Sequence, residues 1–250
     1  MNQAQRLLNL FVSLTGRGAD QPMTQVWSAV FELNPQSQSI EDDVMVCLLA
    51  LRSEIDSVSN KLISHDVNTE LMEPGFSRFK ATASPQYINQ NWDGLRGNIQ
   101  APECRLSFLW AAWALREEDD DDIQAQDKAA IEDALIVLEK ALAESNISPY
   151  LKSFVQRQVT AIRNALRIAK VQGAEPLREA MRKFAGDLKV EDTKFKAAIS
   201  ESPEEAKITL KAMAEVIEKA AKICDGANKV WSFTQSIGGL VSDLMLPYVK

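Results

Sequence analysis

Histidine is nearly absent from this chain: among its 250 residues, only His65 carries an imidazole. A metal site built from several histidines is therefore excluded. A histidine base in an enzyme could only be His65. We expect His65 at the end of a helix beside Asp66, where a cationic side chain interacts favourably with the helix dipole. No serine or cysteine nucleophile motif accompanies it. The sequence therefore predicts a non-enzymatic protein without catalytic residues, bound metal or cofactor.

Cysteine is also scarce. Cys47, Cys104 and Cys224 are far apart, odd in number and form no CxxC pair, which favours reduced thiols over a disulfide framework. No stretch reaches the roughly 18 uninterrupted apolar residues of a membrane-spanning helix. The first apolar stretch is short and interrupted by polar residues, which is not typical of a signal peptide. We therefore expect a soluble, cytoplasmic protein.

Glycine, proline and aromatic residues are few. Ten glycines, nine prolines and an aromatic content of 7% argue against a fold rich in sheets and turns. With 28 basic and 35 acidic side chains, the formal net charge is −7, which disfavours binding of nucleic acid by the molecule as a whole. The composition therefore indicates a helical globular protein, and nucleic acid is not an expected partner.

The N-terminal quarter shows helical periodicity. Residues 3–15 place Leu7, Leu10, Phe11 and Leu14 at the spacing i, i+3, i+4 and i+7, which is typical of an amphipathic helix. Similar patterns predict helices at 22–33 and 39–64. Residues 66–101 differ, because prolines and glycines recur there without sustained periodicity. We therefore expect an N-terminal helical unit over residues 1–65, an irregular linker or lid over 66–101, and a C-terminal helical bundle over 102–250.

The C-terminal part reads as consecutive helices. They are expected at 103–116, 123–144, 149–171, 176–188, 203–224 and 227–246, with a turn or a helix at 191–199. The last two carry apolar residues at alternating spacings of three and four and are separated by Asp225-Gly226, which predicts an antiparallel hairpin. The predicted fold class is all-α: a multi-helix bundle with a C-terminal antiparallel helical hairpin and an irregular central linker.

The helix expected at 103–116 contains two tryptophans within the run LSFLWAAWAL. Leu106, Leu109, Trp110 and Trp113 have helical spacing and form its apolar stripe. An exposed pair of tryptophans would suggest a surface on which ligands stack. In so apolar a run, we instead expect both rings, together with that of Phe108, to lie in the core.

An acidic run lies between two of these helices. The stretch REEDDDDIQAQD, residues 116–127, contains six consecutive carboxylates. Asp121 and Gln124 have the spacing of a capping box, and negative charge near a helix N-terminus is favoured by about 0.3–1 kcal/mol. We therefore expect a capped helix start and not a metal site. The remaining carboxylates are candidates for contact with a basic partner: Glu117, Glu118, Asp119 and Asp120.

The helix expected at 149–171 carries a basic stripe. Lys152, Arg163, Arg167 and Lys170 fall within about 60° of one another on the helical wheel. One interpretation is a contact with a macromolecular partner. The other, which we favour, is a face compensated by acids of the same chain: a hairpin turn after residue 144 would bring Asp127 near Arg167 and the acidic run near Lys170.

Three functional hypotheses follow. The leading one is a non-enzymatic helical interaction protein that binds a protein partner through its segregated acidic and basic surfaces. The first alternative is a membrane-active or pore-forming helical effector whose C-terminal hairpin inserts through residues 227–246. The second is a metal-dependent helical enzyme that uses surface carboxylates, which would require carboxylates projecting inward from several helices.

Overall fold

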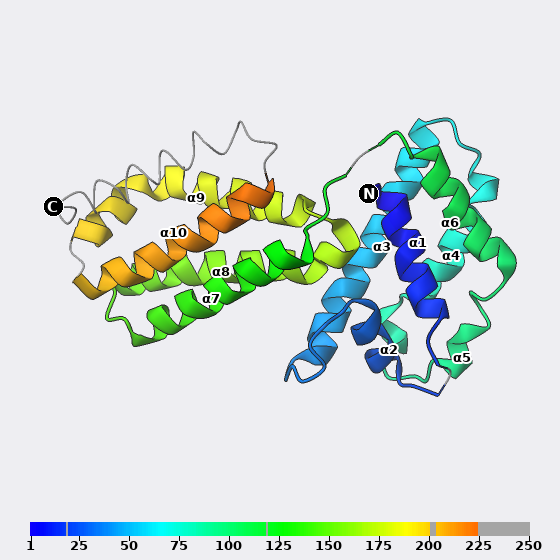
Figure 1. Cartoon of the computed structure of the whole chain (residues 1–250), viewed down its shortest axis with the longest axis horizontal. Helices are drawn as coiled ribbons and strands as arrows, with labels where there is room; N and C mark the ends of the chain where they lie inside the picture. The colour runs from blue at the N-terminus through cyan, green and yellow to red at the C-terminus, as the bar shows by residue number, and fades with distance from the viewer. Residues whose placement is uncertain (19, 119, 201–203, 225–250) are drawn as a thin grey trace. The chain divides into compact units, whose positions relative to one another are not determined.

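The computed structural model describes residues 1–18, 20–118, 120–200 and 204–224, and it places most of them in helices (Figure 1). The α-helices of this described part are α1 (Gln3–Thr15), α2 (Met23–Val30), α3 (Ile40–Ser64), α4 (Glu73–Thr82), α5 (Asp93–Arg96), α6 (Pro102–Ala114), α7 (Ala125–Glu144), α8 (Pro149–Gln172), α9 (Glu175–Ser200) and α10 (Glu204–Cys224). Two short 3₁₀ helices, η1 (Thr69–Leu71) and η2 (Pro85–Tyr87), lie on either side of α4 in the sequence. The predicted all-α fold is confirmed. The helix expected at 227–246, and with it the C-terminal hairpin, lies outside the described residues.

The chain forms two units, each with its own hydrophobic core. Unit 1 consists of residues 1–122 and 167–173, and therefore holds α1 to α6 and the last part of α8. Among the described residues, unit 2 consists of 123–166, 174–200 and 204–224. These divisions differ from the boundaries after residues 65 and 101 that the sequence suggested.

Residues 66–101 form an integral part of unit 1, and not the irregular linker or lid that we expected. They fold into η1, α4, η2 and α5, and α4 places Phe76 and Phe79 in the core with exposures of 3% and 0%. The prolines that obscured the helical pattern stand at helix starts: Pro74 in the first turn of α4 and Pro85 in the first turn of η2. A proline is tolerated there, because the first N–H groups of a helix have no partner within it.

Four phenylalanines form the centre of the unit 1 core. Phe11 of α1 and Phe76 and Phe79 of α4 surround Phe108 of α6, with ring centroids 4.9, 4.9 and 5.3 Å from that of Phe108. All four rings are buried. Burying one such side chain contributes about 1.5–3 kcal/mol. The Phe108 side of α6 is therefore held against α1 and α4, and the other side of α6 faces away from this core.

Helices α4 and α6 approach each other closely at Gly75. A Cβ atom at this position would lie 2.6 Å from the Cβ atom of Ser107 and 2.7 Å from the carbonyl oxygen of Cys104. Both distances are shorter than van der Waals contact, and a backbone carbonyl cannot rotate away as a long side chain would. Only small residues on the facing side of α6 permit this approach.

Gly75→Ala is expected to lower the free energy of unfolding by about 1–3 kcal/mol, because the added methyl group overpacks the α4–α6 contact. Gly186→Ala in α9 is the matched control. Nothing lies within 4 Å of a Cβ atom at Gly186, and alanine is favoured over glycine inside a helix by about 1 kcal/mol, so this change is expected to stabilise. Urea unfolding followed by circular dichroism measures both. A Gly75→Ala protein as stable as the parent would contradict the close packing.

In unit 2, the helices α7, α8, α9 and α10 share one core. Leu135, Phe154, Phe184 and Ile217, one from each helix, have exposures of 2% or less. α9 is one continuous helix where the sequence suggested two shorter elements, because its buried positions keep helical spacing through to Phe195. Only residues 145–148 connect α7 and α8, and the two helices run side by side in opposite directions (Figure 1).

Candidate functional site

An apolar stripe runs along the exposed side of α6. Leu106, Leu109, Trp110 and Trp113 occupy positions i, i+3, i+4 and i+7, which share one side of a helix. Their exposures are 52, 42, 51 and 58%. We call these four residues the α6 stripe. A single exposed leucine is ordinary, but a contiguous row of large apolar side chains is typical of a binding surface.

Trp110 and Trp113 were expected in the core together with Phe108. Phe108 is buried there, but both tryptophans are exposed, so the prediction is wrong for the tryptophans. α6 carries a second stripe, and the structure buries this one: Cys104, Ser107, Phe108, Ala111 and Leu115. The small side chains of the second stripe allow α4 to approach at Gly75, where the bulk of a tryptophan would not fit. Both stripes have helical spacing, so periodicity alone does not choose between them.

The C-terminal end of the α6 stripe has an ordered aromatic arrangement. The Trp110 and Trp113 rings meet edge to face, with centroids 5.8 Å apart and an interplanar angle of 86°. The guanidinium carbon of Arg116 lies 4.4 Å from the centroid of the Trp113 ring, a cation–π contact. Arg116 Nε also lies 3.3 Å from a carboxylate oxygen of Glu117, whose side chain is 85% exposed. The apolar surface thus ends at a charged rim.

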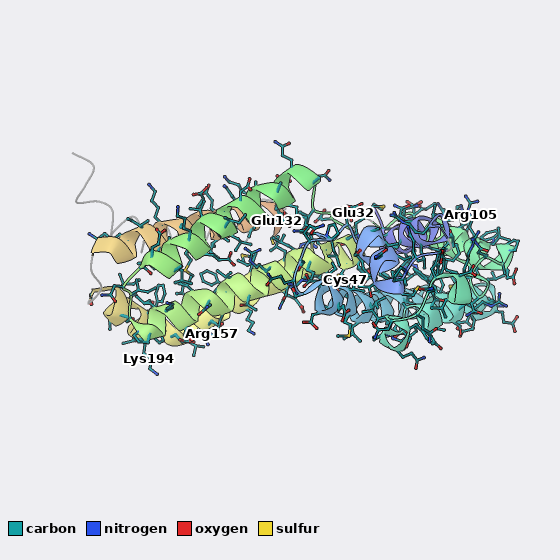
Figure 2. All side chains as sticks on the ribbon, turned by 90° about the horizontal axis from the view of Figure 1, so that it is seen from below. Glu32, Cys47, Arg105, Glu132, Arg157 and Lys194 are labelled. Carbon is teal, nitrogen blue, oxygen red and sulfur yellow. The ribbon has the colours of Figure 1, made fainter. Side chains whose placement is uncertain are left out.

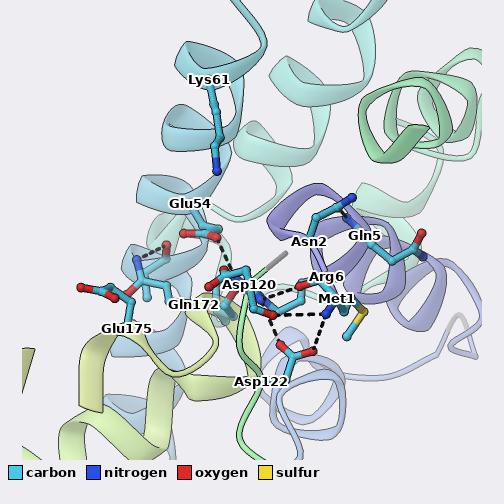
Figure 3. A network of polar contacts seen from close by, with 12 residues as sticks. Met1, Asn2, Gln5, Arg6, Glu54, Lys61, Asp120, Asp122, Gln172 and Glu175 are labelled. Atoms are coloured by element: carbon cyan, nitrogen blue, oxygen red, sulfur yellow. Dashed lines mark hydrogen bonds and ion pairs between the residues drawn. The ribbon is translucent and has the colours of Figure 1, made fainter. Parts of the chain in front are cut away.

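Arg6 of α1 is nearly inaccessible to solvent, and carboxylates surround it (Figure 3). Its guanidinium forms an ion pair with Asp120 and a second one with Asp122, where Nη1 and Oδ1 are 2.9 Å apart. Arg6 Nε donates a hydrogen bond of 3.3 Å to the carbonyl oxygen of Val171. A buried guanidinium is tolerated only when its charge is paired and its N–H groups are bonded. Through these ion pairs and this hydrogen bond, Arg6 connects α1 with the acidic run and with the end of α8.

Glu54 of α3 is the third carboxyl group beside Arg6, and it is 4% exposed. Its Oε1 atom lies 3.6 Å from Arg6 Nη2, beyond hydrogen-bonding distance, and accepts no hydrogen bond from the residues that the structure describes. Burial raises the pKa of Glu54 to about 7; the positive charge of Arg6 opposes this shift, and the negative charge of Asp120 adds to it. The Glu54 carboxyl group is therefore partly protonated at neutral pH.

The acidic run does not cap the next helix, contrary to our expectation. α7 begins at Ala125, with Gln124 at its N-cap and no side-chain hydrogen bond to the first turn, so Asp121 and Gln124 do not form a capping box. Asp120 and Asp122 turn toward Arg6 instead. The physical reason is that a buried guanidinium binds a carboxylate more strongly than an exposed helix N-terminus does.

The four carboxylates predicted to contact a partner have different surroundings. Glu118 pairs with Lys61 and lies 2.7 Å from His65 Nε2, and the hydrogen bonds from these two side chains lower the pKa of Glu118. Asp120 is bound to Arg6. Asp119 lies outside the described residues. Among the described members of this set, Glu117 is the most accessible to a partner.

Two of the basic candidates, Arg167 and Lys170, belong to unit 1. Arg167 Nε lies 3.0 Å from a carboxylate oxygen of Asp43, and Lys170 Nζ lies 2.6 Å from one of Glu32. We expected Asp127 and the acidic run to compensate these charges. The acids that pair with them come instead from α3 and from the residues just after α2.

The other two basic candidates, Arg163 and Lys152, belong to unit 2. Arg163 donates two hydrogen bonds to Glu139 of α7, at 2.7 and 2.5 Å. Lys152 lines an open groove of about 690 Å³ between α8 and α9, together with Arg157 and Lys183. Lys152 forms no ion pair with the described residues, so it is the basic candidate most accessible to a partner.

Arg6 and Glu54 were not identified from the sequence, although Glu54 left a signal. Glu54 lies on the same side of α3 as Leu51, Ile55 and Val58, which are all buried. It therefore interrupts an apolar stripe. A carboxyl group at such a position must be buried, and it then needs a partner or a proton. The identity of that partner depends on contacts between distant parts of the chain.

Neither a family model nor a curated protein nor a solved structure matches this chain. In its described part, no helix has the length and hydrophobicity that crossing a membrane requires. Within the same residues, no cluster of three or more histidine, cysteine, aspartate or glutamate side chains is arranged to hold a metal ion. Residues 227–246, on which the membrane hypothesis depends, lie outside the described residues. What the protein does must therefore be inferred from its own surfaces.

Proposed function

We propose that this protein acts without catalysis, by binding another protein through the α6 stripe. The observation that carries the proposal is the exposure of four large apolar side chains at the spacing i, i+3, i+4 and i+7. This is the spacing with which a helix meets a partner helix or groove. Covering such a surface is favourable by about 25 cal/mol for each Å² of apolar area removed from water.

The two tryptophans are the expected energetic centre of the contact. Tryptophan is enriched among interface residues whose truncation costs 2 kcal/mol or more, a typical hot-spot threshold. The edge-to-face contact of Trp110 with Trp113 and the cation–π contact of Trp113 with Arg116 restrict both rings before any partner binds. Less conformational entropy is then lost on binding.

The segregated charges that first suggested an interaction protein now have a smaller part in the proposal. Arg163, Arg167, Lys170 and Asp120 are engaged in intramolecular ion pairs, and a partner would have to compete with these. Glu117, which follows the α6 stripe directly, is instead well placed at the rim of the contact. Rim charges mainly steer association and orient the partner.

Changing Trp110 and Trp113 together to serine is expected to weaken partner binding by at least about 100-fold, because two hot-spot side chains are lost. The partner is first identified by affinity capture from the native source and then titrated with the purified variants. Ile136→Ser in unit 2 is the control, since Ile136 is 59% exposed and lies outside the α6 stripe. Equal binding by the double variant would show that α6 is not the contact. Turnover of a nucleotide or peptide by the pure protein would contradict the non-catalytic role.

A further inference from the structure

The two edges of the α6 stripe carry opposite charges. Counting about 100° per residue, Glu103 lies about 70° to one side of the stripe's centre, and Arg105 lies about 90° to the other side. Both side chains are exposed, and Arg105 is labelled on the surface of unit 1 in Figure 2. Glu103 pairs with Arg78 of α4 at 3.2 Å, whereas Arg105 forms no ion pair with any described residue. The apolar surface is thus bordered by an acidic edge and a basic edge.

This arrangement is self-complementary for one orientation of two α6 helices. Suppose that two α6 helices are related by a two-fold axis parallel to them, so that they run in the same direction. The acidic edge of each copy then lies beside the basic edge of the other, and the contact occurs twice. If the helices are antiparallel with their stripes in register, position 103 of each copy lies opposite position 116 of the other, so the two Glu103 side chains are about 20 Å apart along the axis and neither Glu103 nor Arg105 meets its counterpart. Because only the parallel orientation brings Glu103 of each copy beside Arg105 of the other, the edges favour that orientation.

We propose that the protein bound by the α6 stripe is a second copy of this chain, with the two α6 helices parallel and side by side. The inference rests on the proposed function, since it names the partner of the same surface. Leu106 and Trp113 are seven residues apart and face their counterparts across the two-fold axis, as do equivalent core positions of a parallel helix pair. Leu109 and Trp110 flank them, and Arg105 of each copy faces Glu103 of the other.

The size of the surface sets the expected strength of the dimer. A standard interface buries about 800 Å² on each partner. Four partly exposed side chains provide only part of that area. We therefore expect reversible association with a dissociation constant on the order of micromolar.

A lipid surface fits the α6 stripe less well than a second copy does. Helices that lie on membranes carry lysine and arginine along their polar face, which anionic headgroups attract. The α6 stripe has Glu103 on one edge and Arg105 on the other, and Arg116 and Glu117 lie side by side at its end. The positive and negative charges around the stripe balance, so anionic headgroups have no net attraction to it.

Sedimentation equilibrium of the full chain, between about 1 and 200 µM, tests the dimer. The parent protein is expected to change from monomer to dimer across this range. The double change of Trp110 and Trp113 to serine is expected to leave a monomer, while Ile136→Ser dimerises like the parent. Circular dichroism verifies that each variant is folded, which is expected because all three side chains are exposed.

Charge reversal tests the orientation. Glu103→Arg gives one chain two basic edges, and Arg105→Glu gives it two acidic edges, so each variant alone is expected to dimerise at least about tenfold more weakly than the parent. An equimolar mixture is expected to form a heterodimer, because an all-basic copy then meets an all-acidic one. A mixture that associates no better than either variant alone would overturn the parallel arrangement.

The remaining outcomes separate this inference from the proposed function. A protein that is monomeric at every concentration, or a dimer that survives loss of both tryptophans, overturns the inference. If such a protein still captures a different protein in a manner that depends on the tryptophans, the proposed function stands and only the second copy is wrong. Binding of a monomer to phosphatidylserine vesicles that is lost with the tryptophans would make lipid the occupant. A monomer that captures neither would overturn both.

Discussion

Replacement of Arg6 by methionine is expected to lower the free energy of unfolding by about 3–5 kcal/mol, the usual cost of removing one member of a buried ionic group. Methionine fills a similar volume, so the loss comes mainly from the charge and the hydrogen bonds. Asp120 and Asp122 would lose their guanidinium partner, and the carbonyl oxygen of Val171 would lose its N–H donor. Urea unfolding at neutral pH measures the effect.

Two further arginine variants define the origin of this loss. Arg6→Lys keeps the positive charge but cannot reach two carboxylates and a carbonyl oxygen at once, so an intermediate loss is expected. Arg78→Met removes the exposed ion pair with Glu103 and is expected to cost no more than about 1 kcal/mol. If Arg6→Met were as mild as Arg78→Met, the carboxylates around Arg6 would not depend on it for stability.

A second large effect is expected from pH, and its origin is Glu54. The folded protein holds the Glu54 proton up to about pH 7, whereas the unfolded chain releases it near the ordinary value of 4.5. Between these values the folded state binds more protons, so the stability that this group contributes is full below about pH 4.5 and is lost as the pH rises through 7. The difference amounts to about 3 kcal/mol, at about 1.4 kcal/mol for each pH unit.

Glu54→Gln tests this effect because it replaces the ionisable group with a neutral one of the same shape. Near pH 5 the variant is expected to match the parent, whose Glu54 is then protonated. At pH 8 the variant is expected to be the more stable by up to about 3 kcal/mol, since it buries no charge. Unfolding curves recorded from pH 5 to pH 8 make the comparison. Parallel stability profiles for the two proteins would show that Glu54 ionises normally.

Glu118→Gln is the control of opposite sign. Because hydrogen bonds from Lys61 and His65 lower the pKa of Glu118, its ionised form stabilises the fold. This contribution is present above the ordinary pKa of a glutamate and is lost as the pH falls through the lowered value. The variant is therefore expected to be less stable than the parent at neutral pH and to approach it in acid.

Periodicity located most of the helices because it depends only on nearby residues. The leucine spacing in residues 3–15 predicted the bounds of α1, and the boundaries of α3, α6 and α8 were predicted to within two residues. Residues 66–101 were missed because α4, η2 and α5 are too short for a repeating pattern to stand out. Their order comes from contacts that Phe76 and Phe79 make with residues distant in the sequence.

The candidate sites were harder to predict than the helices. α6 has apolar residues on two sides, and the choice between them was made by a close contact at Gly75, which lies in another helix. The acidic run was recognised as a feature, but its main partner, Arg6, is 114 residues from Asp120. Local sequence patterns contain no information about a pairing over such a distance. The three-dimensional structure was needed to show which charges are internal and which apolar side chains are exposed.

Unit 1 is built from two separate segments of the chain, and this determines when it can finish folding during translation. The carbonyl oxygen that receives Arg6 belongs to Val171, and Val171 is itself fully buried in the unit 1 core. A ribosome therefore has to synthesise α7 and nearly all of α8 before the first helix can complete its contacts. During that interval the nascent N-terminal helices would carry an unfilled gap in their core. Folding of unit 1 is thus completed by a segment translated some fifty residues after the rest of it, and a chain stopped at residue 122 would lack that segment.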